Sequence, residues 1–267
     1  MSEFLIAIII GIIEGVTEFL PVSSTGHMIL AGAVLDFNGS KAATFMIFIQ
    51  LGAILSVVVL YWDRFIGLLK NNGGGFSGPK GIFKLGLACL PALMAGAVLH
   101  KYIKTHLFTP LTVAAGLILG GIVMVFIERF NLLRKVSSID DITPLQALKI
   151  GVFQTLSLWP GISRSGSTII GGMLCGLERK AAAEFSFLVA VPIMIAATGY
   201  DLLKSLNSLS VDDVPLFATG FLTAFVSAML AVKLFVSFVS KHTMAGFGIY
   251  RIIVGVLTIL FITEVAG

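Results

Sequence analysis

Two short stretches decide the fold, because each interrupts an apolar segment with a polar turn. Residues 14–27 read EGVTEFLPVSSTGH, and residues 160–168 read PGISRSGST. The proline in each stretch breaks a helix, and the hydroxyl residues after it are typical of the start of the next helix. Each stretch therefore predicts two short helices joined by a turn, within residues 4–35 and 144–176.

The whole chain has the composition of a membrane protein. Apolar residues make up 57% of its 267 residues and charged residues only 12%, and the mean hydropathy is +1.02. Because ordinary globular domains carry about 25% charged residues, a soluble domain of this size could not cover its surface. The composition excludes a cytosolic enzyme, a disordered chain and a nucleic-acid binder, whose basic residues would gather in one patch.

Six apolar runs approach the roughly 20 residues that a helix needs to cross a bilayer. They cover residues 45–62, 82–99, 107–127, 185–203, 215–236 and 247–262. The two interrupted segments are too short to cross twice, so each predicts a re-entrant hairpin whose turn faces protein or a wet cavity. The expected fold is an all-α polytopic membrane protein with six transmembrane helices and two re-entrant helical hairpins, in a single membrane domain.

The two interrupted segments also resemble each other. A shift of 140 positions aligns Ser23 with Ser163 and Glu14 with Gln154. Without a gap, nine identities occur between residues 10–45 and their shifted partners. A chain of this composition would give about three by chance. Compositional bias is the alternative explanation, but the coincidence of both polar turns argues against it.

The repeat predicts a topology. Repeat 1 would cover about residues 1–135 and repeat 2 about residues 141–267, each with one hairpin and three crossings. Because three is an odd number, the second repeat must be inverted relative to the first. If the loop after Trp62 lies inside, the inside segments carry eleven Lys and Arg residues and the outside segments four, as the positive-inside rule prefers. Both chain ends then lie outside, and the glycine-rich segment 71–81 is a cytoplasmic connector.

The first turn is preceded by two acidic residues at membrane depth. Glu14 and Glu18 are four residues apart and share one helix face. Two carboxylates on one face repel each other unless a cation or a proton lies between them. A divalent metal bound by both would resolve this repulsion. The alternative is that both glutamates are protonated and hydrogen-bond neighbouring helices.

The first turn itself carries candidates for a nucleophile. Ser23, Ser24 and Thr25 open the second short helix, where hydroxyl residues are ordinary N-caps but where the free N–H groups also favour an anion. His27 follows three residues after Ser24. A serine, a histidine and an upstream glutamate are the parts of an activated nucleophile. Taken alone, a lone histidine in an apolar segment is more often structural than catalytic.

The second turn carries the complementary charge. Arg164 stands among hydroxyl residues at another helix start, and a guanidinium pairs bidentately with phosphate. The alternative is that Arg164 neutralises Glu14 or Glu18. Both interpretations bring the two turns together, as a pocket for a strongly anionic group. Two further residues are candidates: Gln50 for lining the cavity, and Arg251 for a second anion contact or for pairing with Glu264.

These two motifs carry a family resemblance. The stretch from Glu14 to His27 and the stretch from Pro160 to Thr168 resemble the two signature motifs of the bacterial undecaprenyl-diphosphatases of the bacitracin-resistance type. The resemblance covers the whole chain and implies an integral enzyme of the bacterial plasma (inner) membrane, with its active site open to the outer, periplasmic face. It implies hydrolysis of undecaprenyl diphosphate to undecaprenyl phosphate and inorganic phosphate, which recycles the lipid carrier of the cell wall and gives bacitracin resistance.

The resemblance also implies roles for residues and partners. The catalytic residues would be Glu18, Ser24, His27 and Arg164, and the phosphate site would be lined by Glu14, Ser23, Thr25, Ser163, Ser165 and Thr168. A divalent cation, Mg²⁺ or Ca²⁺, would be held near Glu14 and Glu18. The expected partners are a polyprenyl diphosphate substrate and membrane lipids, with no nucleic acid, and a homodimer stays open.

Two mechanisms and a second function remain open from the sequence. Ser24 is the candidate nucleophile, with His27 as its base or as the acid for the leaving phosphate, and with Glu18 orienting one of them. In a rival scheme a metal-bound hydroxide attacks directly. The alternative function is a transporter or flippase of polyprenyl phosphate, because inverted repeats with broken helices are typical of transporters.

Overall fold

The structure is a computed structural model that describes residues 1–70, 75–130, 134–205 and 210–266, without the side chains of residues 104, 205 and 262–266. Segment 71–74 of the predicted connector lies outside the described residues. In chain order the elements, where η marks a short 3₁₀ helix, are α1 (Glu3–Thr17), α2 (Ser24–Val34), α3 (Gly39–Leu60), α4 (Trp62–Leu69), α5 (Gly78–His106), α6 (Pro110–Glu128), η1 (Ile139–Asp141), α7 (Pro144–Gln154), η2 (Thr155–Leu158), α8 (Arg164–Leu174), α9 (Arg179–Ser205), η4 (Val211–Asp213), α10 (Val214–Val239) and α11 (Ala245–Ala266).

The described part contains five helical segments that are long and apolar enough to cross a membrane. They cover Gly39–Leu60, Gly78–Ile103, Pro110–Glu128, Arg179–Lys204 and Val211–Val239. The protein is therefore a polytopic helical membrane protein, as predicted. The sixth predicted crossing falls in α11, whose described apolar section, Ala245–Phe261, is shorter. Five of the six predicted crossings are thus found over the described residues.

The two predicted interruptions fall between short helices. α1 ends at Thr17 and α2 begins at Ser24, while α8 begins at Arg164 after the turn that follows η2. The residues just before α2 and α8, Ser23 and Ser163, have φ angles of 72° and 75°. A left-handed conformation costs a non-glycine residue roughly 1–2 kcal/mol. The same costly conformation therefore occurs at two positions that the 140-residue shift aligns.

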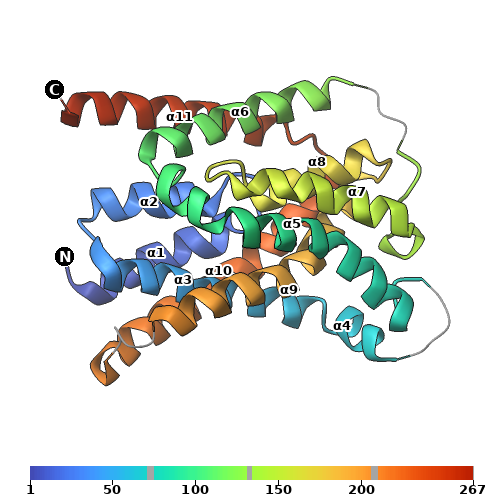
Figure 1. Cartoon of the computed structure of the whole chain (residues 1–267), viewed down its shortest axis with the longest axis horizontal. Helices are drawn as coiled ribbons and strands as arrows, with labels where there is room; N and C mark the ends of the chain where they lie inside the picture. The colour runs from blue at the N-terminus through green and yellow to red at the C-terminus, as the bar shows by residue number, and fades with distance from the viewer. Residues whose placement is uncertain (71–74, 131–133, 206–209, 267) are drawn as a thin grey trace.

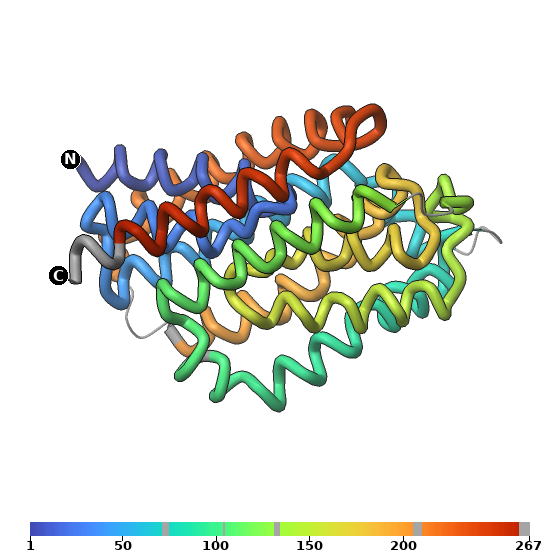
Figure 2. The backbone as a smooth tube through the Cα atoms, turned by 90° about the horizontal axis from the view of Figure 1, so that it is seen from above, coloured from blue at the N-terminus to red at the C-terminus, as the bar shows by residue number. Residues whose placement is uncertain are grey.

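The packing of the helices follows the same correspondence. α1 packs along α10 and α7 packs along α5, while α6 packs along α11 and α3 contacts both α9 and α10. α1 also packs on α2, and α7 on α8, so each pair of short helices folds back on itself. Figures 1 and 2 show the start of α1 and the end of α11 at the same end of the molecule. This agrees with the predicted topology, in which both chain ends lie on one side.

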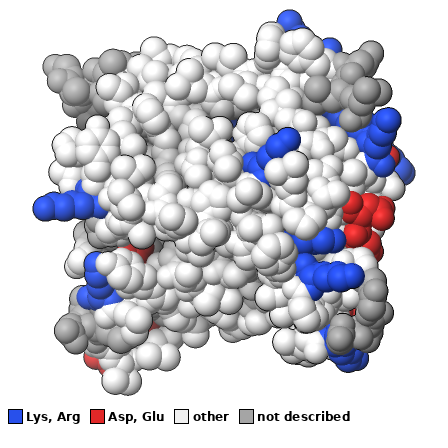
Figure 3. Space-filling model, turned by 45° about the vertical axis from the view of Figure 1, so that its right-hand side comes forward, with Lys and Arg blue, Asp and Glu red and all other residues white. Residues whose placement is uncertain are grey.

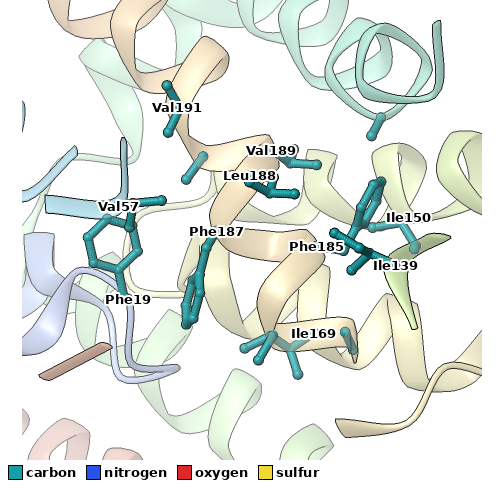
Figure 4. Close-up of a cluster of buried hydrophobic side chains, with 14 of the residues drawn as sticks. Phe19, Val57, Ile139, Ile150, Ile169, Phe185, Phe187, Leu188, Val189 and Val191 are labelled. Atoms are coloured by element: carbon teal, nitrogen blue, oxygen red, sulfur yellow. The ribbon is translucent and has the colours of Figure 1, made fainter. Parts of the chain in front are cut away.

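An apolar core around α9 supports the first turn (Figure 4). Phe185, Phe187 and Leu188 of α9 are fully buried. The ring of Phe19, from the first turn, meets the ring of Phe187 edge to face, with 5.5 Å between their centroids. Such pairs contribute about 0.5–1.5 kcal/mol beyond the burial of the rings. The first turn is therefore anchored on the same helix that contacts α8.

Ion pairs join the segments that the sequence analysis assigned to the inside. Arg64 donates to Asp140 over 3.0 Å, and Arg179 donates to Glu128 over 2.8 Å. The backbone N–H of Met244 also donates to Glu128, over 3.0 Å. Figure 3 shows most charged side chains toward the margins of the visible face, with a wide uncharged surface between them. This distribution is the one expected of a protein whose middle lies in lipid.

Candidate active site

The carboxylate of Glu18 joins the two turns. Its Oε2 accepts a hydrogen bond from the hydroxyl of Ser24, and its Oε1 lies 3.0 Å from Nη2 of Arg164. The side chains of Glu18 and Arg164 are only 8% and 12% exposed. Buried charges are stable only when they are paired and hydrogen-bonded, and this pair meets that condition. The structure therefore brings the arginine of the second turn to the acid and serine of the first. It also contains the predicted alternative, in which Arg164 neutralises Glu18.

Arg164 is held in place from α9. Its Nη1 donates to the backbone oxygen of Ser186 over 3.1 Å and lies 3.4 Å from the Ser186 hydroxyl. The guanidinium also lies over the ring of Phe19, 5.7 Å from its centroid. Its Nε has no hydrogen-bond partner in the described part of the chain. The sequence did not reveal Ser186, because a serine within an apolar helix has no distinguishing pattern.

A polar cavity of about 170 Å³ opens beside this ion pair. Glu18, Ser24 and Arg164 contribute to its wall, and so does Gln50, as predicted. The cavity is lined by Glu18, Ser23, Ser24, Thr25, Gln50, Ser157, Pro160, Gly161, Ser163, Arg164 and Met194. Both turns thus face one small space lined by hydroxyls, a carboxylate and a guanidinium. This chemistry suits a phosphoryl group rather than a hydrocarbon chain.

The predicted phosphate-binding hydroxyls have different positions. Ser165 donates to the backbone oxygen of Leu20 over 2.8 Å and so ties the second turn to the first. Thr168 bonds to the Ser186 hydroxyl over 2.6 Å, behind Arg164. These two residues do not line the cavity, whereas the other three predicted hydroxyls do: Ser23, Thr25 and Ser163.

Two helix N-termini point their dipoles toward the cavity. α2 begins at Ser24, and its N-cap residue, Ser23, makes no side-chain capping bond. α8 begins at Arg164, and the hydroxyl of Ser163 accepts from the Gly166 N–H over 3.1 Å. Each N-terminus carries about half a positive charge and free N–H groups. The site is therefore electropositive at both turns and suits an anion.

His27 lies outside this cluster. Its Nδ1 is 2.8 Å from the backbone oxygen of Ser23, and its Nε2 is 2.7 Å from the hydroxyl of Tyr250. A carbonyl oxygen only accepts, so Nδ1 carries the proton, and Nε2 shares the second hydrogen bond with the Tyr250 hydroxyl. The hypothesis that His27 is the base for Ser24 has no hydrogen bond to support it, because Glu18 occupies that position. Tyr250 was not identified from the sequence, since it stands 223 positions after His27.

Glu14 is fully buried in α1. Neither of its carboxylate oxygens has a hydrogen-bond partner in the described part of the chain. The aligned residue in the second repeat, Gln154, is also fully buried, and its Oε1 is likewise without a partner there. An unpartnered buried carboxylate requires a proton or a cation. A proton or a cation on Glu14 fits this geometry. The predicted alternative, two protonated glutamates bonded to neighbouring helices, does not, because Glu14 has no partner in the described part of the chain and Glu18 pairs with Arg164.

The donor set available to a metal is small. Over the described residues, no group of three or more His, Cys, Asp and Glu side chains is arranged to hold a metal ion. The free oxygens of Glu14 nevertheless fit a hard divalent cation, which prefers carboxylate ligands and takes its remaining ligands from water and substrate phosphates. Glu14 itself does not line the cavity, contrary to the prediction that it lines the phosphate site, because its side chain is fully buried.

The chain is similar to known proteins over almost its whole length. The chain matches the family described as "Bacitracin resistance protein BacA" over residues 7–257. The chain belongs to the BacA family. A protein named "Undecaprenyl-diphosphatase" from Desulfovibrio desulfuricans is 52% identical to it over 265 residues, which are 99% of this chain and 100% of the relative.

Two other relatives are similar over almost their whole length. An "Undecaprenyl-diphosphatase" from Nitratidesulfovibrio vulgaris is 53% identical over 262 residues, 98% of this chain and 99% of the relative. An "Undecaprenyl-diphosphatase 1" from Bacillus thuringiensis is 49% identical over 267 residues, 98% of this chain and 99% of the relative. The resemblance inferred from the two motifs is thereby confirmed. These names describe a diphosphatase and give no support to the transporter alternative.

Proposed function

We propose that this BacA-family protein hydrolyses undecaprenyl diphosphate to undecaprenyl phosphate and inorganic phosphate. This reaction recycles the lipid carrier of cell-wall synthesis and gives bacitracin resistance. The observation that carries the proposal is the Glu18 carboxylate, held between the Ser24 hydroxyl and the Arg164 guanidinium beside a small polar cavity. Phosphoryl transfer depends mainly on positioning and charge neutralisation, which these groups supply. The names of the full-length relatives support the substrate.

Ser24 is the nucleophile of the proposed reaction. Its Oγ attacks the terminal phosphorus, and its proton passes to Glu18, to which it is already hydrogen-bonded. The bond between the terminal phosphorus and the bridging oxygen breaks, and Glu18 returns the proton to the undecaprenyl phosphate that leaves. Water then attacks the phosphoserine, which regenerates the Ser24 hydroxyl and releases inorganic phosphate. In the rival scheme, water attacks the substrate directly and no phosphoserine forms.

Arg164 and the two helix N-termini bind the transferring group. In the transition state the phosphoryl oxygens carry more negative charge. The planar guanidinium and the oriented backbone N–H groups stabilise that charge. Arg164 contributes to the cavity wall, which places its guanidinium beside the transferring group. Ser23, Thr25 and Ser163 add hydroxyl donors from the cavity wall. Ser165 and Thr168 act indirectly, by fixing the second turn and Ser186.

His27 acts after the first step in this scheme. Its ring is held by hydrogen bonds to Ser23 and Tyr250, and neither of its nitrogens is bonded to Ser24 or Glu18. From this position it serves as an acid or base for the phosphate that leaves, through water, rather than as the base for Ser24.

The proposal includes a divalent cation, Mg²⁺ or Ca²⁺, held by Glu14 and Glu18. The unpartnered oxygens of Glu14 support it. When bound, such an ion neutralises the charge of the diphosphate. Glu14 and Glu18 would hold it, while Ser24, Glu18 and Arg164 carry out the steps described above.

The proposed topology has six crossings, two re-entrant hairpins and an inverted repeat, with the site open to the periplasmic side of the bacterial inner membrane. Ser23 and Ser163 support the repeat, because they share a rare backbone conformation. The grouping of basic segments around Asp140 and Glu128 supports a cytoplasmic end. Neither the inverted repeat nor the orientation in the membrane depends on a homodimer.

The decisive test is phosphate release from undecaprenyl diphosphate by the purified protein in detergent micelles, with and without a chelator. We expect release that stops with chelator and returns with Mg²⁺ or Ca²⁺. Replacing Ser24 by Ala should lower kcat at least about 10³-fold, whereas Ser237→Ala, at an exposed serine of α10, should not. A wild-type protein that releases no phosphate contradicts the hydrolase, and Ser24→Ala with normal turnover contradicts the nucleophile. Mass spectrometry of phosphoserine at Ser24 separates the two schemes.

A further inference from the structure

A buried arginine that takes no part in the proposed steps forms hydrogen bonds to both turns. Arg251 of α11 is only 1% exposed. Its Nη1 donates to the backbone oxygen of Pro21 over 3.3 Å, in the first turn. Its Nη2 donates to the oxygens of Gly161 and Ile162 over 3.0 and 2.7 Å, in the second turn. One guanidinium therefore contacts both turns at once.

The chain makes room for this guanidinium. A Cβ at Gly120 of α6 would lie 2.0 Å from Nη2 of Arg251, and a Cβ at Gly166 of α8 would lie 3.1 Å from its Nη1. Nη2 also lies 3.2 Å from the backbone oxygen of Gly116, one turn earlier in α6. Larger residues at these glycines would displace the guanidinium. The contact is thus built from four separate segments of the chain.

Arg251 has no carboxylate partner among the described side chains. The alternative partner considered from the sequence, Glu264, lies outside the described side chains. The other alternative, a direct contact with a bound anion, does not fit the geometry, because both terminal nitrogens already donate to carbonyl oxygens and Arg251 does not line the cavity. Its interactions are instead with the backbone of the turns.

Those carbonyls lie next to the costly backbone conformations. Ile162 directly precedes Ser163, and Pro21 stands two residues before Ser23. A conformation that costs a non-glycine residue free energy persists only where its surroundings hold it. The donor to the Ile162 oxygen holds the peptide group that sets the φ angle of Ser163, and the donor to the Pro21 oxygen holds the peptide group one residue earlier in the first turn. Arg251 is thus in a position to hold both turns in the form that directs Ser24 and Arg164 toward Glu18.

We propose that Arg251 is a positioning residue, which fixes the distance between the two turns and thereby aligns Ser24, Glu18 and Arg164 for the reaction. This inference rests on the proposed phosphatase function. Misplacing reacting groups by about 1 Å can cost about 10²-fold in rate. Lysine keeps the charge but has one nitrogen and no planar fork, so it cannot contact both turns in the same way.

The test compares Arg251→Lys and Arg251→Met in the full-length protein, by phosphate release and by thermal unfolding. We expect both variants to lose about 10²-fold in kcat, with KM changed by less than about threefold. A role for the charge alone predicts that Lys restores the kcat that Met loses, and that result would overturn the proposal.

Two further variants separate positioning from general stability. Arg179→Gln removes the partly buried ion pair with Glu128, which contacts neither turn through its hydrogen bonds, and it should lower the melting temperature without a comparable loss of kcat. Gly120→Ala deletes no group but pushes the guanidinium aside, so it should lose kcat even if the Arg251 variants do not fold. Normal kcat in Gly120→Ala contradicts the proposal. If the wild-type protein itself releases no phosphate, the proposed function fails instead.

Discussion

At the scale of single residues, the site depends on a guanidinium that has several tasks. Arg164 pairs with Glu18, donates to the backbone of Ser186 and contributes to the cavity wall. These directions match a planar fork and cannot all be satisfied by an ammonium group. Its geometry, as well as its charge, is therefore part of the site.

The variant Arg164→Lys separates geometry from charge. We expect kcat/KM for undecaprenyl diphosphate to fall about 10²-fold, because loss of one preorganised donor to a transition state has that effect. Steady-state phosphate release measures it. Arg129→Lys makes the same change at an exposed position and should leave kcat/KM unchanged. Equal activity of both variants would remove the basis for Arg164 as a phosphate clamp.

The sequence allowed some residues of the site to be predicted and not others. Glu18, Ser24 and Arg164 stand out because charged or hydroxyl groups beside a proline are rare inside apolar segments. Tyr250 and Ser186 do not, because each stands in an ordinary apolar helix and gains its contact only when distant helices pack. The position of His27 against Tyr250 rather than Ser24 is a consequence of that packing.

At the scale of helices, close approach of backbones replaces a hydrophobic driving force, which is weak between helices in lipid. α1 and α10 show this at Gly15, where a Cβ would lie 2.4 Å from the oxygen of Ala224 and 2.7 Å from the backbone nitrogen of Ala228. These atoms are backbone and cannot move aside cheaply. The packing of α1 therefore needs glycine there.

Gly15→Ala should destabilise the protein by forcing α1 away from α10. Overpacking costs about 1–3 kcal/mol, so we expect a lower melting temperature in detergent. The matched control is Gly86→Ala in α5, where nothing lies within 4 Å of the added Cβ. This control should melt no lower than the wild type, since alanine favours a helix more than glycine does. A melting temperature of Gly15→Ala equal to that of the control would contradict this account.

The helices themselves were largely predictable from hydropathy and helix breakers. Pro21 and Pro160 mark both interruptions, and the long apolar runs correspond to five candidate spans. The choice of partner for each helix was not predictable. It depends on small residues such as Gly15 and Gly120, whose role appears only when the facing atoms are known.

At the scale of the whole molecule, polar contacts at one end join segments that are far apart in sequence. Asp140 of η1 accepts from Arg64 of α4 over 3.0 Å, from the Phe76 N–H over 2.8 Å and from the Ser138 hydroxyl over 3.1 Å. Lys84 of α5 lies 3.5 Å from the backbone oxygen of Asp140. One carboxylate thus joins the connection between the repeats to the first repeat.

This cluster makes the stability of the protein depend on pH. Partial burial alone would raise the pKa of Asp140, but the Phe76 N–H and Arg64 outweigh it and hold that pKa below its ordinary value. Because the pKa is lower in the folded state, the stabilisation is present above the ordinary carboxyl pKa and is lost as the pH falls through the folded-state value. Neutral pH therefore stabilises the contacts around Asp140.

We expect the melting temperature to fall as the pH is lowered from about 7 toward about 3, across the ordinary Asp pKa of about 3.9. Asp140→Asn should melt lower than the wild type at neutral pH and lose less on acidification, because its amide does not titrate and pairs poorly with Arg64. Asp212→Asn, at an exposed carboxylate, should keep the wild-type pH profile. If acidification lowers the melting temperatures of Asp140→Asn and the wild type by the same amount, titration of Asp140 does not cause the pH dependence of stability.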